Sequence, residues 1–406
     1  MNSILRKMTL STAVLLAVNV SAFADAGQPH GHEAFASKSD AHTHGSEAGN
    51  VRTGDNSIEI YGKLYMSLGY SDPGINAPET IELSSHGSVL GVRGNKPLSE
   101  DIRLFWQIES LIDVDNMGTG GHDSGGNTSL LAGSDSFVGL SGNTGTLLFG
   151  KHNTPLTMLV HANDPFMHIA GDALSILGHV GHHYQSSFDP DHGTMFYVRA
   201  PNSIMYMSPE VGGFSTNVAL IAIDESTQEG ARIPGTSLSL NFKSGGFNLA
   251  YAFERHNELD HKTSHTVGAD PELLDKSQVH VLSAMVHFPT TMVNVTVEQL
   301  KVADDVDGNH KRWAYHLSVQ QMFGLHSLRA AYAHASDFGD HASGASDGAQ
   351  MLAVGWFQAL SSTTQAYVAL ASTQNKPRGD FGTFFVHEIS RGADPTTLAT
   401  GLIHYF

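Results

Sequence analysis

Hydrophobic and polar residues alternate along the chain from residue 57 onward. In SIEIYGKLYMSLGY, one face of an extended chain would carry Ile58, Ile60, Leu64, Met66 and Leu68, and the other Glu59, Tyr61, Lys63, Tyr65 and Ser67. A period of two predicts β-strands with one apolar and one polar face. The same alternation over residues 102–109, and in further segments up to the last residue, predicts an all-β protein.

The connections between the predicted strands alternate in length. Tight connections are expected near residues 95–100, 142–145, 209–213, 243–246, 289–291, 323–325 and 360–363. Longer polar stretches lie near residues 71–82, 113–133, 153–201, 223–234, 256–276, 303–311, 336–348 and 375–394. Seven turns alternating with eight loops predict sixteen antiparallel strands, each about the 9–11 residues that a tilted membrane strand needs. A soluble β-sandwich is the alternative, but its connections would not segregate by length and its outward face would be polar.

The beginning of the chain predicts export. Residues 1–24 contain Arg6 and Lys7, then an apolar stretch too short to span a bilayer, and end in the small-x-small motif of Ala22 and Ala24. This combination is typical of a cleaved secretory signal peptide.

Residues 25–56 are expected to be a disordered leader, because they are rich in Gly, Ala, Ser and His and nearly free of large apolar side chains. The leader contains two H-x-H pairs, His30 with His32 and His42 with His44. We interpret them as part of a solvated polar segment, with a weak metal site as the alternative. Residues 57–406 are the predicted barrel.

Composition excludes several classes of function. The 406 residues include no Cys, and the 40 acidic residues outnumber the 22 basic ones, for a formal charge of −18. Disulfides, thiolate catalysis and cysteine-based metal centres are therefore excluded, and the overall charge argues against a nucleic-acid partner. Because no spacing of Ser, His and acidic residues announces a catalytic triad, an enzyme built on a barrel is the least favoured alternative, and no cofactor is expected.

The final segment TGLIHYF has no charged side chain other than a possible charge on His404. In hydrocarbon every backbone donor and acceptor must be paired, so a last strand of this kind is expected to close the barrel. Phe406 then belongs to the aromatic girdle at the membrane boundary.

Several stretches, taken in order, resemble a known family. They are YGKLYMSLGY, GSVLGVRG, LFWQIES, SFVGLSGNTGTLLFGKHNTPL, the DPF of the third loop, NSIMYMSPEVGGF and GLIHYF. Over Ser57–Phe406 the chain is similar to Gram-negative trimeric porins of the general diffusion type. The resemblance implies a sixteen-stranded homotrimer in the outer membrane that passes small hydrophilic solutes and ions. It also implies contact with outer-membrane lipid and lipopolysaccharide, and an assembly machinery that reads a C-terminal Phe such as Phe406.

The resemblance also indicates where the pore narrows. In this family the long third loop folds into the lumen, with acidic side chains facing basic ones on the wall. The acidic candidates here are Asp164 and Asp172, and the basic ones are Lys63, which the strand phase also directs to the lumen, and Arg199. Equally open alternatives are an ion pair at the base of the loop for Arg199 and an Asp-Pro turn for Asp164. The phase of Lys151 points it outward, toward the trimer contact.

Two departures from the family pattern bear on ion selectivity. Val89 and Ser134 stand where the family often has Arg, which predicts a wall depleted in basic groups and a preference for cations.

The third loop is rich in His, and the densest group is in GHVGHH. We interpret these residues as solvated and titrating rather than as a metal site. A channel specific for sugars or metal ions is the alternative function.

Overall fold

The computed structural model describes residues 51–53, 56–75, 77–85, 87–115, 132–179, 196–221, 235–256, 277–304, 308–338, 346–384 and 389–406. The predicted signal peptide and residues 25–50 of the predicted leader lie outside this range. Within the described residues, no helix is both long and apolar enough to cross a bilayer.

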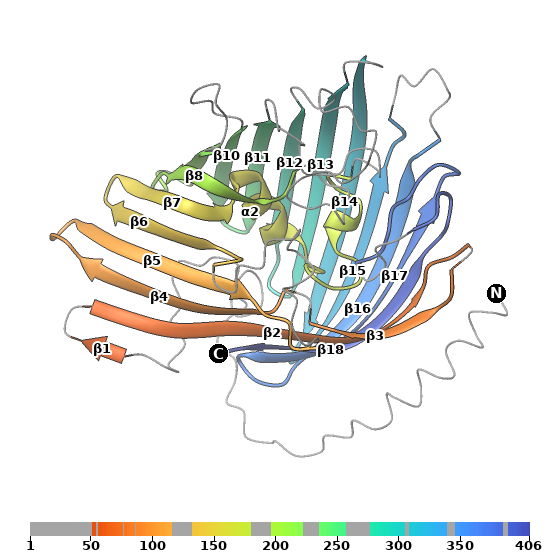
Figure 1. Cartoon of the computed structure of the whole chain (residues 1–406), viewed down its shortest axis with the longest axis horizontal. Helices are drawn as coiled ribbons and strands as arrows, with labels where there is room; N and C mark the ends of the chain where they lie inside the picture. The colour runs from red at the N-terminus through yellow and green to blue at the C-terminus, as the bar shows by residue number, and fades with distance from the viewer. Residues whose placement is uncertain are drawn as a thin grey trace. The chain divides into compact units, whose positions relative to one another are not determined.

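The described chain is almost entirely β-structure (Figure 1). The first half contains β1 (Val51–Thr53), β2 (Asn56–Asp72), β3 (Thr80–Ser84), β4 (Val89–Pro97), β5 (Ile102–Leu111), β6 (Ser136–Gly142), β7 (Gly145–Asn153), β8 (Arg199–Met207) and β9 (Phe214–Ile221). The second half contains β10 (Gly235–Ser244), β11 (Phe247–His256), β12 (Gln278–His287), β13 (Thr291–Asp304), β14 (Gly308–Phe323), β15 (His326–Ala335), β16 (Ala349–Ala359), β17 (Thr364–Asn375) and β18 (Thr396–Tyr405). Between β7 and β8 lie helix α2 (Pro155–Asn163) and the short 3-10 helix η1 (Ala173–Ser175).

The sheet is a closed antiparallel barrel. Each strand pairs with its neighbour along the chain, and β18 pairs with β2 to complete the ring. Because β3 and β4 both pair with β2, along different halves of it, they together occupy one place in the wall. The wall therefore has sixteen strand positions, which confirms the predicted number, and the seven turns and eight loops fall where they were expected.

Two features of the wall were not predicted. The second wall strand is interrupted between β3 and β4, and there the hydroxyl of Ser88 accepts from Tyr65 N (2.9 Å) and donates to Tyr65 O (3.1 Å). The side chain thus satisfies the backbone groups that the missing strand residues would have paired. The short strand β1 pairs with Asn56–Ile58, where β2 extends beyond the end of β18, so it covers an otherwise open strand edge.

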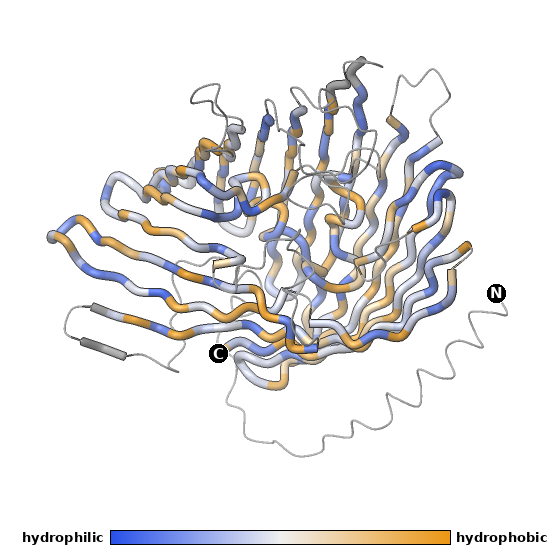
Figure 2. Tube along the Cα trace, in the orientation of Figure 1, coloured by the Kyte–Doolittle hydropathy of each residue, from blue (hydrophilic) through white to orange (hydrophobic). Residues whose placement is uncertain are grey.

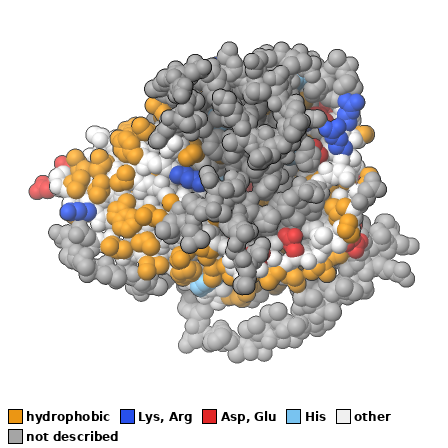
Figure 3. All heavy atoms as spheres, in the orientation of Figure 1, with side chains coloured by type: hydrophobic (Ala, Val, Ile, Leu, Met, Phe, Trp, Pro, Cys, Tyr) orange, Lys and Arg blue, Asp and Glu red, His pale blue; other side chains and the backbone are white. Residues whose placement is uncertain are grey.

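The two faces of the strands differ as the alternation predicted. On β2, the side chains of Ile58, Ile60 and Leu68 are exposed on the outside, whereas Tyr65 and Ser67 are buried on the inside. Figure 2 shows the alternating hydropathy along the strands, and Figure 3 shows hydrophobic side chains gathered over strands β4 to β7 at the left of the view. An apolar outside is typical of a barrel that faces lipid.

The wall is not equally tall all round. Strands β6 and β9 have 7 and 8 residues, whereas β13 and β14 have 14 and 16. A tilted strand needs about 9–11 residues to span the membrane. Strands β6 and β9 are therefore shorter than a bilayer requires, and β7 and β8 between them, with 9 residues each, only just reach that length.

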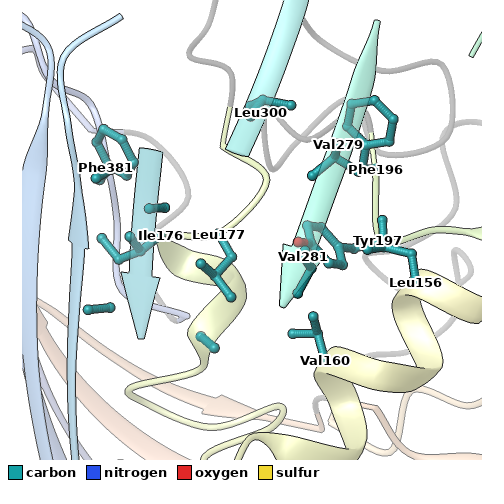
Figure 4. Packing of buried hydrophobic residues seen from close by; sticks show 14 of the residues in the cluster. Leu156, Val160, Ile176, Leu177, Phe196, Tyr197, Val279, Val281, Leu300 and Phe381 are labelled. Atoms are coloured by element: carbon teal, nitrogen blue, oxygen red, sulfur yellow. The ribbon is translucent and has the colours of Figure 1, made fainter. Parts of the chain in front are cut away.

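Helix α2 begins at Thr154, whose side chain accepts from Thr157 N, and Pro155 opens its first turn. Leu156 and Val160 on this helix pack against Val279 and Val281, which belong to the inner face of β12 (Figure 4). The described part of the third loop therefore lies against the inside of the wall.

Further along the loop, a second cluster fixes it to another part of the wall. Phe166, Ile169 and Ala170 are buried against an inner face of β15–β18 that is lined mainly by small side chains. These are Ala331, Ala353, Ala369, Ala371 and Ala399, all at most 3% exposed. The small side chains leave the volume that the loop occupies.

Candidate functional site

Six charged side chains lie close to one another on the inner wall between β2 and the start of β8. We call this group the charged strip, and it consists of Glu59, Lys63, Arg93, Glu109, Asp135 and Arg199. Arg93 Nε lies 2.8 Å from Glu59 Oε2, and Arg199 Nε lies 3.6 Å from Asp135 Oδ1. Three acids and three bases give the strip no formal net charge.

The two predicted basic residues both belong to the charged strip. Lys63 Nζ lies 4.7 Å from the centre of the Tyr65 ring on the inside of β2, as the strand phase predicted. Arg199 opens β8 where the third loop rejoins the wall, and its ion pair with Asp135 is the loop-base arrangement considered as an alternative. Burial raises the pKa of Asp135 to about 6, and Arg199 opposes that rise.

The two predicted acidic residues are brought together inside the third loop. Asp164 accepts from the backbone N–H of Phe166 (2.9 Å) and of Ala173 (2.8 Å). Asp172, only 2% exposed, accepts from the backbone N–H of His168 (2.6 Å) and of Leu174 (2.8 Å). Both carboxylates thus hold the fold of the loop, as expected of the Asp-Pro turn considered for Asp164.

Burial raises the pKa of both carboxyl groups. The pKa of Asp164 rises to about 6, with the two backbone N–H groups acting against the rise. The pKa of Asp172 rises further, first because of burial and then because of the nearby Asp164 carboxylate.

A cavity of about 650 Å³ lies on the turn side of the third loop. Asp164 lines it together with Lys243 and Arg329, and polar side chains such as Asn241 and Gln320 also contribute. Asp172 is not part of the lining. Among the Lys, Arg, Asp and Glu side chains of this lining, two are basic and one is acidic.

Sequence reasoning missed Arg329, which connects the wall to the loop. Its guanidinium lies 3.6 Å above the Phe357 ring, and Nη1 donates to Pro165 O at 2.6 Å. The signal was present, because Leu328 and Tyr332 on β15 are exposed outside and the alternation places Arg329 inside. The same period of two directs Lys63 inward on β2 and Arg329 inward on β15.

The two positions that depart from the family pattern are also on the wall. Val89 is buried, and the Ser134 hydroxyl donates to Glu109 Oε1 at 2.5 Å, while Tyr61 donates to Glu109 Oε2 at 2.8 Å. Lys151 lies next to the exposed Phe149 on β7, and its Nζ donates to Gly133 O at 2.5 Å.

His161, in the described part of the loop, does not have the titrating role that was expected of the loop histidines. Burial, helped by the positive charges of Arg199 and Lys63, lowers the pKa of His161 to about 3, so this side chain stays neutral in mild acid. His182, His183 and His192, and the H-x-H pairs of the leader, lie outside the described residues. Within the described residues no three His, Asp or Glu side chains are grouped so as to hold a metal ion.

Comparisons with known proteins agree with this architecture. The family model of the Gram-negative porins matches residues 11–378. The chain is 27% identical over 296 residues to the major outer membrane protein P.IB of Neisseria gonorrhoeae, covering 68% of this chain and 77% of that protein.

Solved structures show the same fold. An anion-selective porin from Comamonas acidovorans is similar with a TM-score of 0.71 at 21% identity, covering 86% of this chain and all of that one. The trimer form of OmpT from Vibrio cholerae is similar with a TM-score of 0.61 at 12% identity, covering 87% of this chain and all of that one. The related proteins are channels of the outer membrane rather than enzymes. With its closed sixteen-stranded wall, the chain belongs to the Gram-negative porin family and is an outer-membrane porin.

Proposed function

We propose that this porin is a water-filled channel for the passive diffusion of small hydrophilic solutes and ions. The observation behind the proposal is the cavity of about 650 Å³ inside the closed barrel, whose lining includes the charged Lys243, Asp164 and Arg329 as well as apolar side chains. Purified protein in a planar bilayer should produce stepwise increases of current that scale with the conductivity of the salt solution. Currents that saturate at low concentrations of one sugar would instead favour a substrate-specific channel.

For ion selectivity we propose a weak preference for anions near neutral pH, in place of the cation preference expected from the sequence. The charged strip is compensated, and the cavity lining has Lys243 and Arg329 against Asp164. Charges inside a narrow lumen act on ions more strongly than solvated charges on the loops, which salt screens. The anion selectivity of the Comamonas porin is in line with this proposal.

Reversal potentials in a KCl gradient test the sign of this preference. At about pH 7.5 we expect chloride to be favoured, and Arg329→Gln should shift the reversal potential toward that of a cation channel because it removes one positive charge from the lining. Gln keeps a donor for Pro165 O, so the loop contact can be retained. A cation-selective wild-type pore would overturn the proposed sign.

Acidification should strengthen the anion preference. The pKa of Asp164 is raised to about 6, so lowering the pH from about 7.5 to about 5 protonates it and removes a negative charge from the cavity. Asp164→Asn should reduce this pH dependence, and Asp135, whose pKa burial also raises to about 6, should account for what is left. A wild-type preference that moves toward cations on acidification would contradict the assignment.

We also propose that the porin is a homotrimer whose contact lies on the low side of the wall, β6–β9, near Lys151. Two of its four strands, β6 and β9, are shorter than a bilayer requires, yet this side exposes Val138, Phe149 and Ile204. A second copy of the chain would cover this apolar surface without requiring the membrane to thin. The trimer form of the Vibrio structure supports the proposal.

Engineered cysteines test the contact directly, because the chain has none of its own. Val138→Cys should be cross-linked between copies by a short thiol-reactive reagent, and unboiled samples should migrate as trimers in detergent gels. Leu352→Cys, exposed on the tall wall at β16, is the control and should stay uncrosslinked. Equal cross-linking at both positions would argue against this contact surface.

A further inference from the structure

A histidine and a methionine face each other on the inner wall, close to the turn that joins β12 to β13. The two strands are neighbours (Figure 1), and His287 of β12 is paired directly with Met292 of β13. His287 N donates to Gly246 O on its other side, at 2.6 Å, so His287 and Met292 are a non-hydrogen-bonded pair. Side chains lie closest in pairs of this kind, with Cβ atoms about 4.5–5.5 Å apart.

Met285 adds a second thioether to the same face. It precedes His287 by two residues on β12, so both side chains point inward. Its direct partner on β13 is Asn294, two residues beyond Met292, which makes Met285 and Met292 diagonal neighbours. Such neighbours are about 7–8 Å apart, within reach of a long side chain such as Met, which has three rotatable bonds. We call Met285, His287 and Met292, which all line the cavity of about 650 Å³, the Met–His group.

Packing does not explain these side chains. His287 is exposed and Met292 is half-buried, so neither fills a closed core. Met285 is buried, but its direct partners on the two neighbouring strands are the polar Asn248 and Asn294. Thioethers normally fill gaps among apolar side chains, which two amides do not provide. What the three side chains share is a lone pair, on sulfur or nitrogen, that can bind a metal ion.

The ligand set indicates a soft ion. Two thioethers and one imidazole are neutral donors, and thioethers select Cu⁺ among the metal ions of proteins, while imidazole also suits copper. Ca²⁺ and Mg²⁺ require oxygen ligands, and zinc sites use thiolate, imidazole or carboxylate. The Met–His group contains neither a thiolate nor a carboxylate.

Lys243 restricts the charge of the ion. It is paired directly with Asn248 on β11, and Asn248 with Met285 on β12. The backbones of Lys243 and Met285 are therefore two strand spacings, about 9–10 Å, apart. Because the Coulomb energy is proportional to the charge of the ion, Lys243 repels a divalent cation twice as strongly as a monovalent one. A singly charged soft cation therefore fits this part of the lumen better than a divalent one.

We propose that the Met–His group binds a soft monovalent cation, Cu⁺ or Ag⁺, through the sulfur atoms of Met285 and Met292 and one imidazole nitrogen of His287. The short turns of such barrels are on the periplasmic side, so the site is at the periplasmic mouth of the pore. The inference goes beyond passive diffusion. It requires only that these side chains face the lumen, so it is independent of the ion preference proposed above.

Methyl NMR with Ag⁺ tests the site, because Ag⁺ has the charge and the ligand preference of Cu⁺ and needs no reducing agent. The full-length protein is isotopically labelled in its methionine methyl groups and folded in detergent micelles, in a nitrate salt because chloride precipitates silver. Met285→Leu and Met292→Leu, which nearly keep the side-chain volume, each remove and thereby assign one signal. We expect Ag⁺ to shift both signals along one common binding curve, and Zn²⁺ to leave both in place.

Variants decide whether the three residues act together. His287→Phe should weaken the binding of Ag⁺ to both methionines about ten-fold or more, since even indirect partners of a metal often contribute about 10–100-fold in affinity. His326→Phe, at an exposed histidine on the turn end of β15, should leave the binding curve unchanged. The signal of Met66, on the outer face of β2, should stay in place over the same range of Ag⁺.

Several results would each overturn the proposal. They are Met285 and Met292 signals that do not move, signals that follow separate binding curves, a Met66 signal that moves in parallel, and an unchanged affinity in the His287→Phe protein. The channel function is tested separately, by the bilayer currents, and would survive any of these results.

Discussion

Replacing Phe406 with Asp should leave the protein exported but remove most of it from the outer membrane. The end of β18 closes the ring through two hydrogen bonds, from Phe406 N to Gly62 O (3.1 Å) and from Gly62 N to Phe406 O (3.0 Å). The Phe406 ring covers Gly62 so closely that a Cβ added there would lie 2.4 Å from the ring carbon Cζ. It also stacks on His404, with ring centres 6.2 Å apart.

Two effects of Phe406→Asp act in the same direction. The variant would uncover the Gly62 backbone at the seam of the barrel, and it would change the aromatic end that the assembly machinery is expected to read. Phe323→Asp, an exposed aromatic at the turn end of β14, is a matched control for the cost of a charge at this level, which is about 0–1 kcal/mol near the interface even for a basic residue. Immunoblots of separated membranes measure both variants. Equal loss of the two proteins would mean that Phe406 has no special role.

Replacing Gly171 with Ala should lower the unit conductance. Gly171 has a φ of +100°, and an added Cβ would lie 2.4 Å from the Cβ of Ala353 on the inner wall. Neither atom belongs to a flexible side chain, so the loop has to move away from the wall and into the lumen. The narrower lumen should then pass a smaller single-channel current.

The conformational effect of a side chain at positive φ must be separated from this displacement. Gly212, with a φ of +62° and no atom within 4 Å of an added Cβ, is the matched control. Gly212→Ala has a backbone cost of about 1–2 kcal/mol but should keep the normal current. If Gly171→Ala also keeps the normal current, the loop does not set the conductance at this point.

The wall of the barrel could be predicted from the sequence because the patterns that specify its strands are local. The alternation in β2 and β5 and the contrast between short and long connections depend only on neighbouring residues. The interruption between β3 and β4 could not be predicted this way. It depends on Ser88 meeting Tyr65, a contact between residues 23 positions apart.

The interior was harder to predict, because a pore depends on which distant residues face one another. The strand phase placed Lys63 correctly on the inside, but nothing near Arg199 in the sequence announces its ion pair with Asp135. The resemblance to the porin family is what points to Asp164 and Asp172 as lumen charges. Their hydrogen bonds to Phe166 N and Leu174 N show that they also shape the loop, a role that spacing alone does not distinguish.

The alanine-lined inner face of β15–β18 limits which third loops this barrel can accommodate. The small side chains of Ala353 and Ala399 leave room for the third loop, so the loop and this wall fit each other. A loop exchanged between relatives would arrive without its matching wall, and larger residues at these positions would leave it no room. The width of the pore therefore depends on small wall residues far along the chain from the loop as well as on the loop itself.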